Sequence, residues 1–172
     1  MKAVLSCEIL KKRIVTKLEN KRQSWNEEFY ECIKDLATHP AVLRMKRHPH
    51  HGTTNCYQHC INVAYYNYQW CRVLHLDAHS AARGGMLHDM FLYDWHTHAK
   101  CTGDSFHGLT HPAAAHRNAV QFFHLNKIEK DIILNHMWPL TFWRLPRTRE
   151  GFISTLTDKY CGACETGTSL YK

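Results

Sequence analysis

Apolar residues recur three and four positions apart along most of the chain, a period that is typical of amphipathic α-helices. No segment shows the strand–turn–strand pattern in which apolar and polar positions alternate at every second residue. The pattern therefore predicts an all-α fold, a single-domain helical bundle with about six helices. Neither an internal repeat nor a Gly/Ser/Pro-rich linker divides the sequence, so we expect one domain over residues 1–172.

Residues that start or stop helices predict where the first helices lie. A long helix is expected over about 7–36, with a break near Gln23, and His39-Pro40 should end it. Gly52-Thr53-Thr54 indicates a break followed by an N-cap. Apolar positions then continue with helical spacing over about 56–74.

The remaining helices are expected over about 78–89, from 110, over 127–136 and from 148, with an irregular stretch over 93–109. Asp77 is a candidate N-cap for the first of these, and Asn126 with Glu129 forms a capping-box pattern for the third. Thr110-His111-Pro112 places a proline in the first turn of a helix, where proline is tolerated. The small residues of the helix after Asp77 predict close packing against a neighbouring helix.

The N-terminal residues lack the order of a signal peptide. A short apolar stretch within residues 1–10 precedes the charges of residues 11–13, whereas a signal peptide has its charges first. No stretch approaches the roughly 18 apolar residues that a membrane-spanning helix needs. We therefore expect a cytoplasmic protein without membrane association, in which the eight cysteines are reduced.

The formal net charge of +7 with neutral histidines favours an anionic partner. The basic residues are scattered rather than gathered into one long run, so nucleic acid is not the expected partner. A phosphorylated small molecule is the expected ligand, and the oligomeric state stays open.

Histidine is unusually abundant, with fifteen residues in the chain. Six His and Asp positions lie on the expected helices or at their ends and can project ligand atoms inward: His59, His88, Asp89, His111, His136 and Asp158. Imidazole combined with carboxylate suits iron, manganese or zinc, whereas magnesium favours oxygen ligands alone. Six ligands exceed the need of one tetrahedral zinc ion, so two ions bridged by a carboxylate account for them better.

Any single histidine is more often a core or surface residue than a ligand. Four of the fifteen histidines belong to this set of six residues. The other eleven, which include His50 and His51, have no assigned role in this interpretation. The spacing of residues alone therefore leaves the metal cluster open.

Three segments closely resemble the HD-domain superfamily of metal-dependent phosphohydrolases. They are QHCINVA over 58–64, ARGGMLHD over 82–89 and TDK over 157–159. Together they supply a lone His, an adjacent His-Asp pair and a distal Asp, in that order and on helices. The resemblance covers a motif-bearing core over about 50–165, preceded by a helical N-terminal extension over 1–49.

The resemblance also implies how the ligands divide between two metal ions. His111-Pro112 and His136 stand where dinuclear members, such as the cyclic-diguanylate phosphodiesterases and the diiron oxygenases, add ligands for a second metal. It implies one ion on His59, His88, Asp89 and Asp158, and the other on His111, His136 and a bridging Asp89. The sequence departs from the cyclic-diguanylate phosphodiesterases because Met137 follows His136 and no Gly-Tyr-Pro follows downstream, so that activity is not expected.

The activity implied by the resemblance is hydrolysis of a phosphorylated small molecule, foremost a nucleotide, by a metal-activated water. Asp89 takes part as the bridging ligand, and Asp94 is a candidate general acid or a residue that orients a ligating His. Lys159 is a candidate to hold the substrate anion beside Asp158. Further candidates for substrate binding are Arg83, Arg144 and Arg147. Each of these basic residues taken singly is more often a solvated surface charge, and an aspartate such as Asp94 more often caps a local turn.

Two alternatives remain from other classes of function. One is a mixed-valence diiron oxygenase that cleaves a carbon–carbon or carbon–phosphorus bond, and the other is a non-catalytic metal-dependent regulatory domain. No organic cofactor is expected. Cys161 and Cys164 form a C-x-x-C pair, but they fall within the expected last helix rather than on a tight loop, so structural zinc is not expected there.

Overall fold

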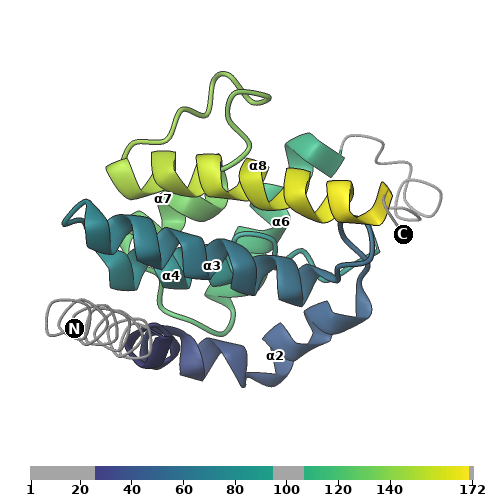
Figure 1. The fold of residues 1–172 in the computed structure, drawn as a ribbon, viewed down its shortest axis with the longest axis horizontal. Coiled ribbons are helices and arrows are strands. Elements are labelled where there is room, and N and C mark those ends of the chain that lie inside the picture. The colour runs from purple at the N-terminus through teal and green to yellow at the C-terminus, as the bar shows by residue number, and fades with distance from the viewer. Residues whose placement is uncertain (1–25, 95–106, 171–172) are drawn as a thin grey trace, which may run out of the picture.

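The computed structural model describes residues 26–94 and 107–170 (Figure 1). Residues 26–37 are helical, and the elements that follow are α2 (Pro40–Leu43), the 3-10 helix η1 (Arg44–Arg47), α3 (Cys56–Val73), α4 (Ala78–Leu87), α6 (His107–Val120), α7 (Lys127–Asn135) and α8 (Arg149–Leu170). The described residues contain no β-strand, and one isolated bridge joins Pro49 to Asn55. The all-helical fold that the apolar period predicted is confirmed.

Two of the expected helix starts are confirmed by their hydrogen bonds. Asp77 caps α4, because its Oδ1 accepts from the backbone N–H of Ser80 at 2.9 Å. The capping box at α7 is complete, since Asn126 Oδ1 accepts from Glu129 N at 2.9 Å and Glu129 Oε2 accepts from Asn126 N at 2.8 Å. These local side-chain contacts satisfy backbone donors that a helix leaves unpaired at its N-terminus.

Two other expected starts are wrong. Asn55, rather than Thr53 or Thr54, caps α3, and its side chain accepts from Gln58 N at 2.9 Å. Helix α6 begins at His107 rather than at residue 110, so Pro112 lies inside the helix and not in its first turn. This earlier turn lies close to the segment after α7, since a Cβ on Gly108 would lie 3.1 Å from Leu140 Cδ2.

The described residues include only the C-terminal part of the long first helix that the sequence predicts. Its described part is helical over 26–37, whereas residues 7–25, with the expected break near Gln23, lie outside the described ranges. His39-Pro40 ends this first helix as expected, and the same two residues begin the next helix, α2. His39 Nδ1 accepts from Ala41 N at 3.2 Å and caps α2, with Pro40 in its first turn.

Helix α4 lies between α3 and α7, and two of its glycines allow the close approach. A Cβ on Gly85 would lie 2.9 Å from Ala64 Cα of α3, and one on Gly84 would lie 2.8 Å from Ile132 Cδ1 of α7. The expected close packing of this helix is confirmed. Helix α8 packs along α3 and α7, on the side of the bundle away from α2 (Figure 1).

The six described cysteines are free thiols. Cys161 and Cys164 lie within α8, as expected, with Cys161 buried and Cys164 exposed. Among the described residues, no helix has both the length and the hydropathy of a membrane-spanning segment.

Candidate metal centre

The six residues expected as ligands converge at one buried point of the bundle. They come from different elements: His59 from α3, His88 and Asp89 from the end of α4, His111 from α6, His136 from the C-cap of α7 and Asp158 from α8. Five of them are at most 4% exposed, and the side chain of Asp158 is 12% exposed. Residues separated by about a hundred positions in sequence are thus brought within contact distance.

Backbone carbonyls orient two of these imidazoles. His88 Nδ1 lies 2.8 Å from Gly85 O, and His136 Nδ1 lies 3.0 Å from Ile133 O. Because a carbonyl oxygen can only accept, Nδ1 carries the proton in both rings. In the neutral ring Nε2 therefore presents its lone pair to the centre of the cluster, as a metal ligand does.

A carboxylate orients the third imidazole. His59 Nδ1 donates to Glu165 Oε2 at 2.8 Å, and Asn62 Nδ2 donates to Glu165 Oε1 at 2.8 Å. His59 Nε2 then lies 3.1 Å from Asp158 Oδ1. A carboxylate behind an imidazole, with the other nitrogen facing a shared site, is a common arrangement around protein-bound metals.

Asp89 lies between two groups of imidazoles. Its Oδ1 is 3.2 Å from His111 Nε2 and 3.6 Å from His136 Nε2, and these two nitrogens are 2.9 Å apart. Its Oδ2 is 3.4 Å from His88 Nε2 and 4.0 Å from His59 Nε2. The two carboxylate oxygens therefore face two separate sets of nitrogen atoms.

Some of these atoms are close together without forming hydrogen bonds. His88 Nε2 and Asp89 Oδ1 are buried, and neither has a hydrogen-bond partner within the described part of the chain. An unpaired buried polar atom costs about 1–3 kcal/mol, so such atoms call for a partner. A cation would satisfy both atoms, and four overlapping groups of His and Asp in the described residues can hold a metal ion: His50/His51/His59, His59/His88/Asp89, His88/His136/Asp158 and Asp89/His111/His136.

The titration properties of the cluster also suit a cation. Burial alone would raise the pKa of Asp89 and Asp158, but the neighbouring histidines hold both pKa values well below the usual range. Burial lowers the pKa of His136 to about 3, so this ring is neutral. Burial would also lower the pKa of His59, but hydrogen bonds with Asp158 and Glu165 raise it to about 10. Without a cation, protons bound to histidine compensate part of the negative charge of the two aspartates.

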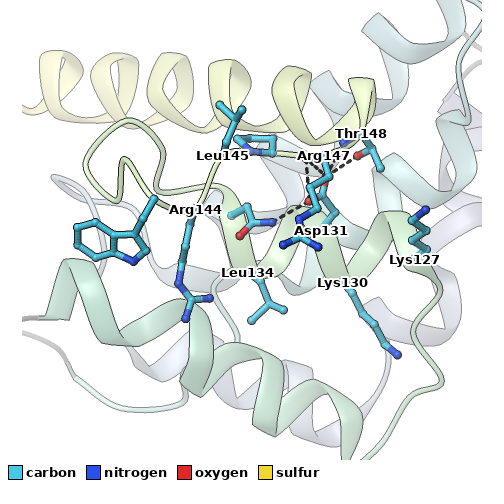
Figure 2. Close-up of a pocket in the computed structure, with 11 residues that line it drawn as sticks. Lys127, Lys130, Asp131, Leu134, Arg144, Leu145, Arg147 and Thr148 are labelled. Atoms are coloured by element: carbon cyan, nitrogen blue, oxygen red, sulfur yellow. Dashed lines mark hydrogen bonds between the residues drawn. The ribbon is translucent and has the colours of Figure 1, made fainter.

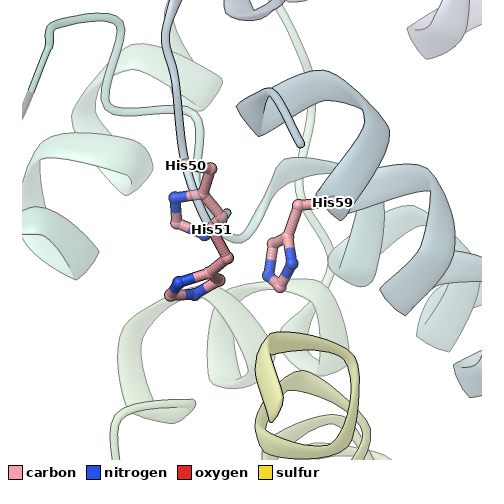
Figure 3. Close-up of side chains that lie close together, drawn as sticks. All are labelled: His50, His51 and His59. Atoms are coloured by element: carbon pink, nitrogen blue, oxygen red, sulfur yellow. The ribbon is translucent and has the colours of Figure 1, made fainter. Parts of the chain in front are cut away.

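Two histidines that received no role from the sequence lie beside the cluster (Figure 3). His50 Nε2 is 3.1 Å from Asp89 Oδ2, and both ring nitrogens of His50 are buried without a hydrogen-bond partner among the described residues. Burial, with the neighbouring His50 and His59, lowers the pKa of His51 to about 4. Their only signal in the sequence is the density of histidine over 48–51, which does not separate ligands from surface residues.

Glu165 is a further residue that the sequence analysis missed. It lies seven residues, or two helical turns, after Asp158 on α8, so the two acidic side chains share a face. This spacing was available in the sequence once a helix was expected there.

A cavity of about 630 Å³ opens beside the cluster. Asp89, His111, His136 and Asp158 line it together with His50, His51 and Lys159, and small residues such as Gly108, Gly162 and Gly167 form part of its wall. Lys159 Nζ lies 3.1 Å from Asp158 Oδ2 and 3.0 Å from His136 O. Among the described residues that line this cavity, Lys159 is the one Lys or Arg, and it lies next to the candidate ligands.

The other residues with expected roles lie elsewhere. Arg83 donates to Asp35 at 2.7 Å and to Glu129 at 3.1 Å, and it does not line the cavity beside the cluster. Arg144 and Arg147 line a different cavity (Figure 2). Asp94 is also absent from the cavity wall, and its charge partly offsets the lowering of the pKa of His48 by burial.

None of the known protein families, curated proteins and solved structures with which the chain was compared matches it. The resemblance to the HD-domain superfamily therefore stays a prediction. The buried clusters of His and Asp are compatible with a site of that type.

Proposed function

We propose that this protein is a metal-dependent phosphohydrolase that acts on a phosphorylated small molecule, foremost a nucleotide. The observation that carries the proposal is the orientation of His59, His88 and His136. Each has its Nδ1 tied to a fixed acceptor, and each turns Nε2 toward a cluster that contains two anionic carboxylates. A structural core would have little use for imidazole nitrogens that converge in this way on two carboxylates.

The donor set divides naturally between two divalent ions of iron, manganese or zinc. His59, His88, Asp158 and Asp89 Oδ2 would hold one, and His111, His136 and Asp89 Oδ1 would hold the other. This division follows the distances around Asp89, whose two oxygens face the two sets. The mixture of imidazole and carboxylate favours transition metals over magnesium.

Bound divalent ions would lower the pKa of a water molecule and polarise a phosphoryl oxygen. The chain itself would position the substrate. The Lys159 ammonium group lies at the cavity wall beside Asp158, where it can attract a phosphate group. His51 is neutral at pH 7, because its pKa is about 4, and can hydrogen-bond a substrate there without adding charge.

The test combines metal analysis with an activity panel. Purified protein should contain about two transition-metal ions per chain, and it should release phosphate or nucleoside from some of a panel of nucleoside phosphates, cyclic nucleotides and simple phosphate esters. Asp158→Asn should abolish turnover. Asp35→Asn is the matched control, because Asp35 pairs with Arg83 away from the cluster. Metal-free protein, or turnover that survives in Asp158→Asn, would contradict the proposal.

A second candidate is a diiron oxygenase, which the preponderance of imidazole in the donor set favours. Four histidines against two aspartates make up the candidate ligands, and His50 adds a further nitrogen close to Asp89. Oxygen uptake by iron-loaded protein, together with silence across the phosphate panel, would select this function instead.

A further inference from the structure

A cavity of about 1000 Å³ lies away from the candidate metal centre. It is bounded by the outer face of α7 and by the segment 143–148 that leads into α8 (Figure 2). No residue lines both this cavity and the one beside the metal cluster. We refer to it as the α7–α8 cavity.

The charge of the α7–α8 cavity is strongly positive. Four basic side chains line it: Lys127, Lys130, Arg144 and Arg147. None of the four forms an ion pair with a carboxylate in the described ranges, where the pairs of Lys and Arg involve other residues. Figure 2 shows the lysines on α7 and the arginines on the facing segment. Four positive charges around one cavity favour an anionic ligand.

Asp131, the one acidic residue among the described residues of the lining, does not neutralise these charges by pairing with them. Its Oδ1 accepts from Asn135 Nδ2 at 2.7 Å, and its Oδ2 accepts from Thr148 N at 2.8 Å and Thr148 Oγ1 at 2.6 Å. The backbone N–H of Arg147 donates to both oxygens, at 3.0 Å each. The carboxylate is thus occupied in tying the segment to α7.

This anchoring gives the cavity a fixed wall. A Cβ on Gly151 would collide with Asp131 Oδ2, so the absence of a side chain there lets the first turn of α8 approach the carboxylate. Thr148 Oγ1 also accepts from Gly151 N at 3.0 Å and caps the helix. A binding surface that is held in place before the ligand arrives loses less free energy to ordering.

The same cavity has an apolar part. Leu134, Trp143, Leu145 and Pro146 line it, and Trp143 is 61% exposed. An indole ring that remains so exposed beside basic side chains can stack on a planar ring such as a nucleotide base. The ligand that fits both parts carries phosphate groups at one end and an aromatic ring at the other.

We propose that the α7–α8 cavity binds a nucleoside di- or triphosphate, with the phosphates on the basic side chains and the base against Trp143. This site is distinct from the candidate metal centre and does not depend on the proposed hydrolase activity. Helix α7 nevertheless joins the two, because Asp131 and Leu134 line the cavity and His136 caps the same helix.

The test is isothermal titration of the purified full-length chain with a non-hydrolysable ATP analogue at low ionic strength, without added metal. One ligand should bind per chain. Arg144→Ala and Arg147→Ala should each raise Kd about tenfold, which corresponds to about 1.4 kcal/mol, because each removes a charge-assisted hydrogen bond to the phosphates. Arg117→Ala is the matched control, since it removes the same charge from an exposed position of α6 outside the cavity and should leave Kd unchanged.

Trp143 provides an independent arm. Trp143→Ala should weaken binding of the ATP analogue several-fold but leave the affinity for inorganic triphosphate unchanged, and Trp143→Phe should retain most of the affinity for the analogue. If an arginine variant fails to fold, Lys130→Ala on the exposed face of α7 serves in its place.

Three results would overturn the inference. The first is that the analogue does not bind the parent protein. The second is that Arg144→Ala and Arg147→Ala both leave the Kd of the analogue unchanged. A single-stranded RNA that binds more than tenfold tighter than the analogue would instead make the cavity part of a nucleic-acid surface. A chain that carries no metal but still binds the analogue through Arg144 and Arg147 would refute the proposed function alone.

Discussion

Asp89→Asn tests the candidate metal centre most directly, because it keeps the shape of the side chain and removes its charge. Asp89 is 3% exposed, so water cannot solvate the neighbouring histidines in place of the lost carboxylate. Its Oδ1 lies 3.2 Å from His111 Nε2, and its Oδ2 lies 3.1 Å from His50 Nε2 and 3.4 Å from His88 Nε2. Removing one partner from a buried set of charges costs about 3–5 kcal/mol of unfolding free energy.

This loss translates into a measurable change in thermal stability. For a domain of this size, a change of 1 kcal/mol shifts Tm by about 2–4 °C, so Tm should fall by about 6–20 °C. The metal content should also fall, from about two ions per chain to one or fewer, because the residue faces both sets of ligands. Calorimetry and elemental analysis of the same preparations measure both effects.

Asp77→Asn is the matched control for this experiment. Asp77 caps α4 on the same helix, and asparagine caps helices about as well as aspartate, so the free energy of unfolding should change by less than about 0.5 kcal/mol. The reasoning is refuted if Asp89→Asn keeps the metal content and the Tm of the parent protein.

Three further predictions follow from the same structure. His111→Ala should reduce the metal content from about two ions to about one, and an unchanged count would contradict the division of ligands. Gly85→Ala should destabilise the protein by about 1–3 kcal/mol in denaturant unfolding, because the new Cβ would meet the backbone of Ala64 at 2.9 Å, whereas Gly167→Ala, with nothing within 4 Å, should be neutral or slightly stabilising. In metal-free protein the pKa of His59 is raised from 6.5 to about 10, so its contribution is complete below pH 6.5 and stability should fall as pH rises toward 10. Thermal unfolding in chelator should lose this part of the pH dependence in His59→Gln, and an identical profile in the variant would exclude His59 as its source.

The helical architecture could be predicted from the sequence because its signals are local. The apolar period, the cap at Asp77 and the capping box at Asn126 and Glu129 all depend on residues a few positions apart. The expected start of α6 was wrong because no local signal marks its first turn, where Gly108 lies close to Leu140. Local chemistry determines which segments are helical, and packing adjusts their ends.

The candidate ligands could be named from motifs, but their relation to one another could not. A motif identifies His88 and Asp89 as neighbours in the chain. Only the packing of α3, α4, α6, α7 and α8 brings the Nε2 atoms of their histidines toward Asp89. The orientation of those atoms depends on acceptors such as Gly85 O and Glu165, which become visible only with the backbone in place.

The arginines show the same limit of prediction from the sequence. Arg83 and Arg147 were expected to bind the anionic substrate, because arginine suits phosphate groups. The type of a residue does not determine which cavity its side chain faces. Arg83 instead pairs with Asp35 and Glu129, while Arg147 lines the α7–α8 cavity. The sequence by itself determined the all-helical fold and the types of residue available for metal chemistry, because both are written in short-range patterns. Only the tertiary structure decided which of those residues meet, since the direction of each side chain depends on how helices distant in sequence pack together.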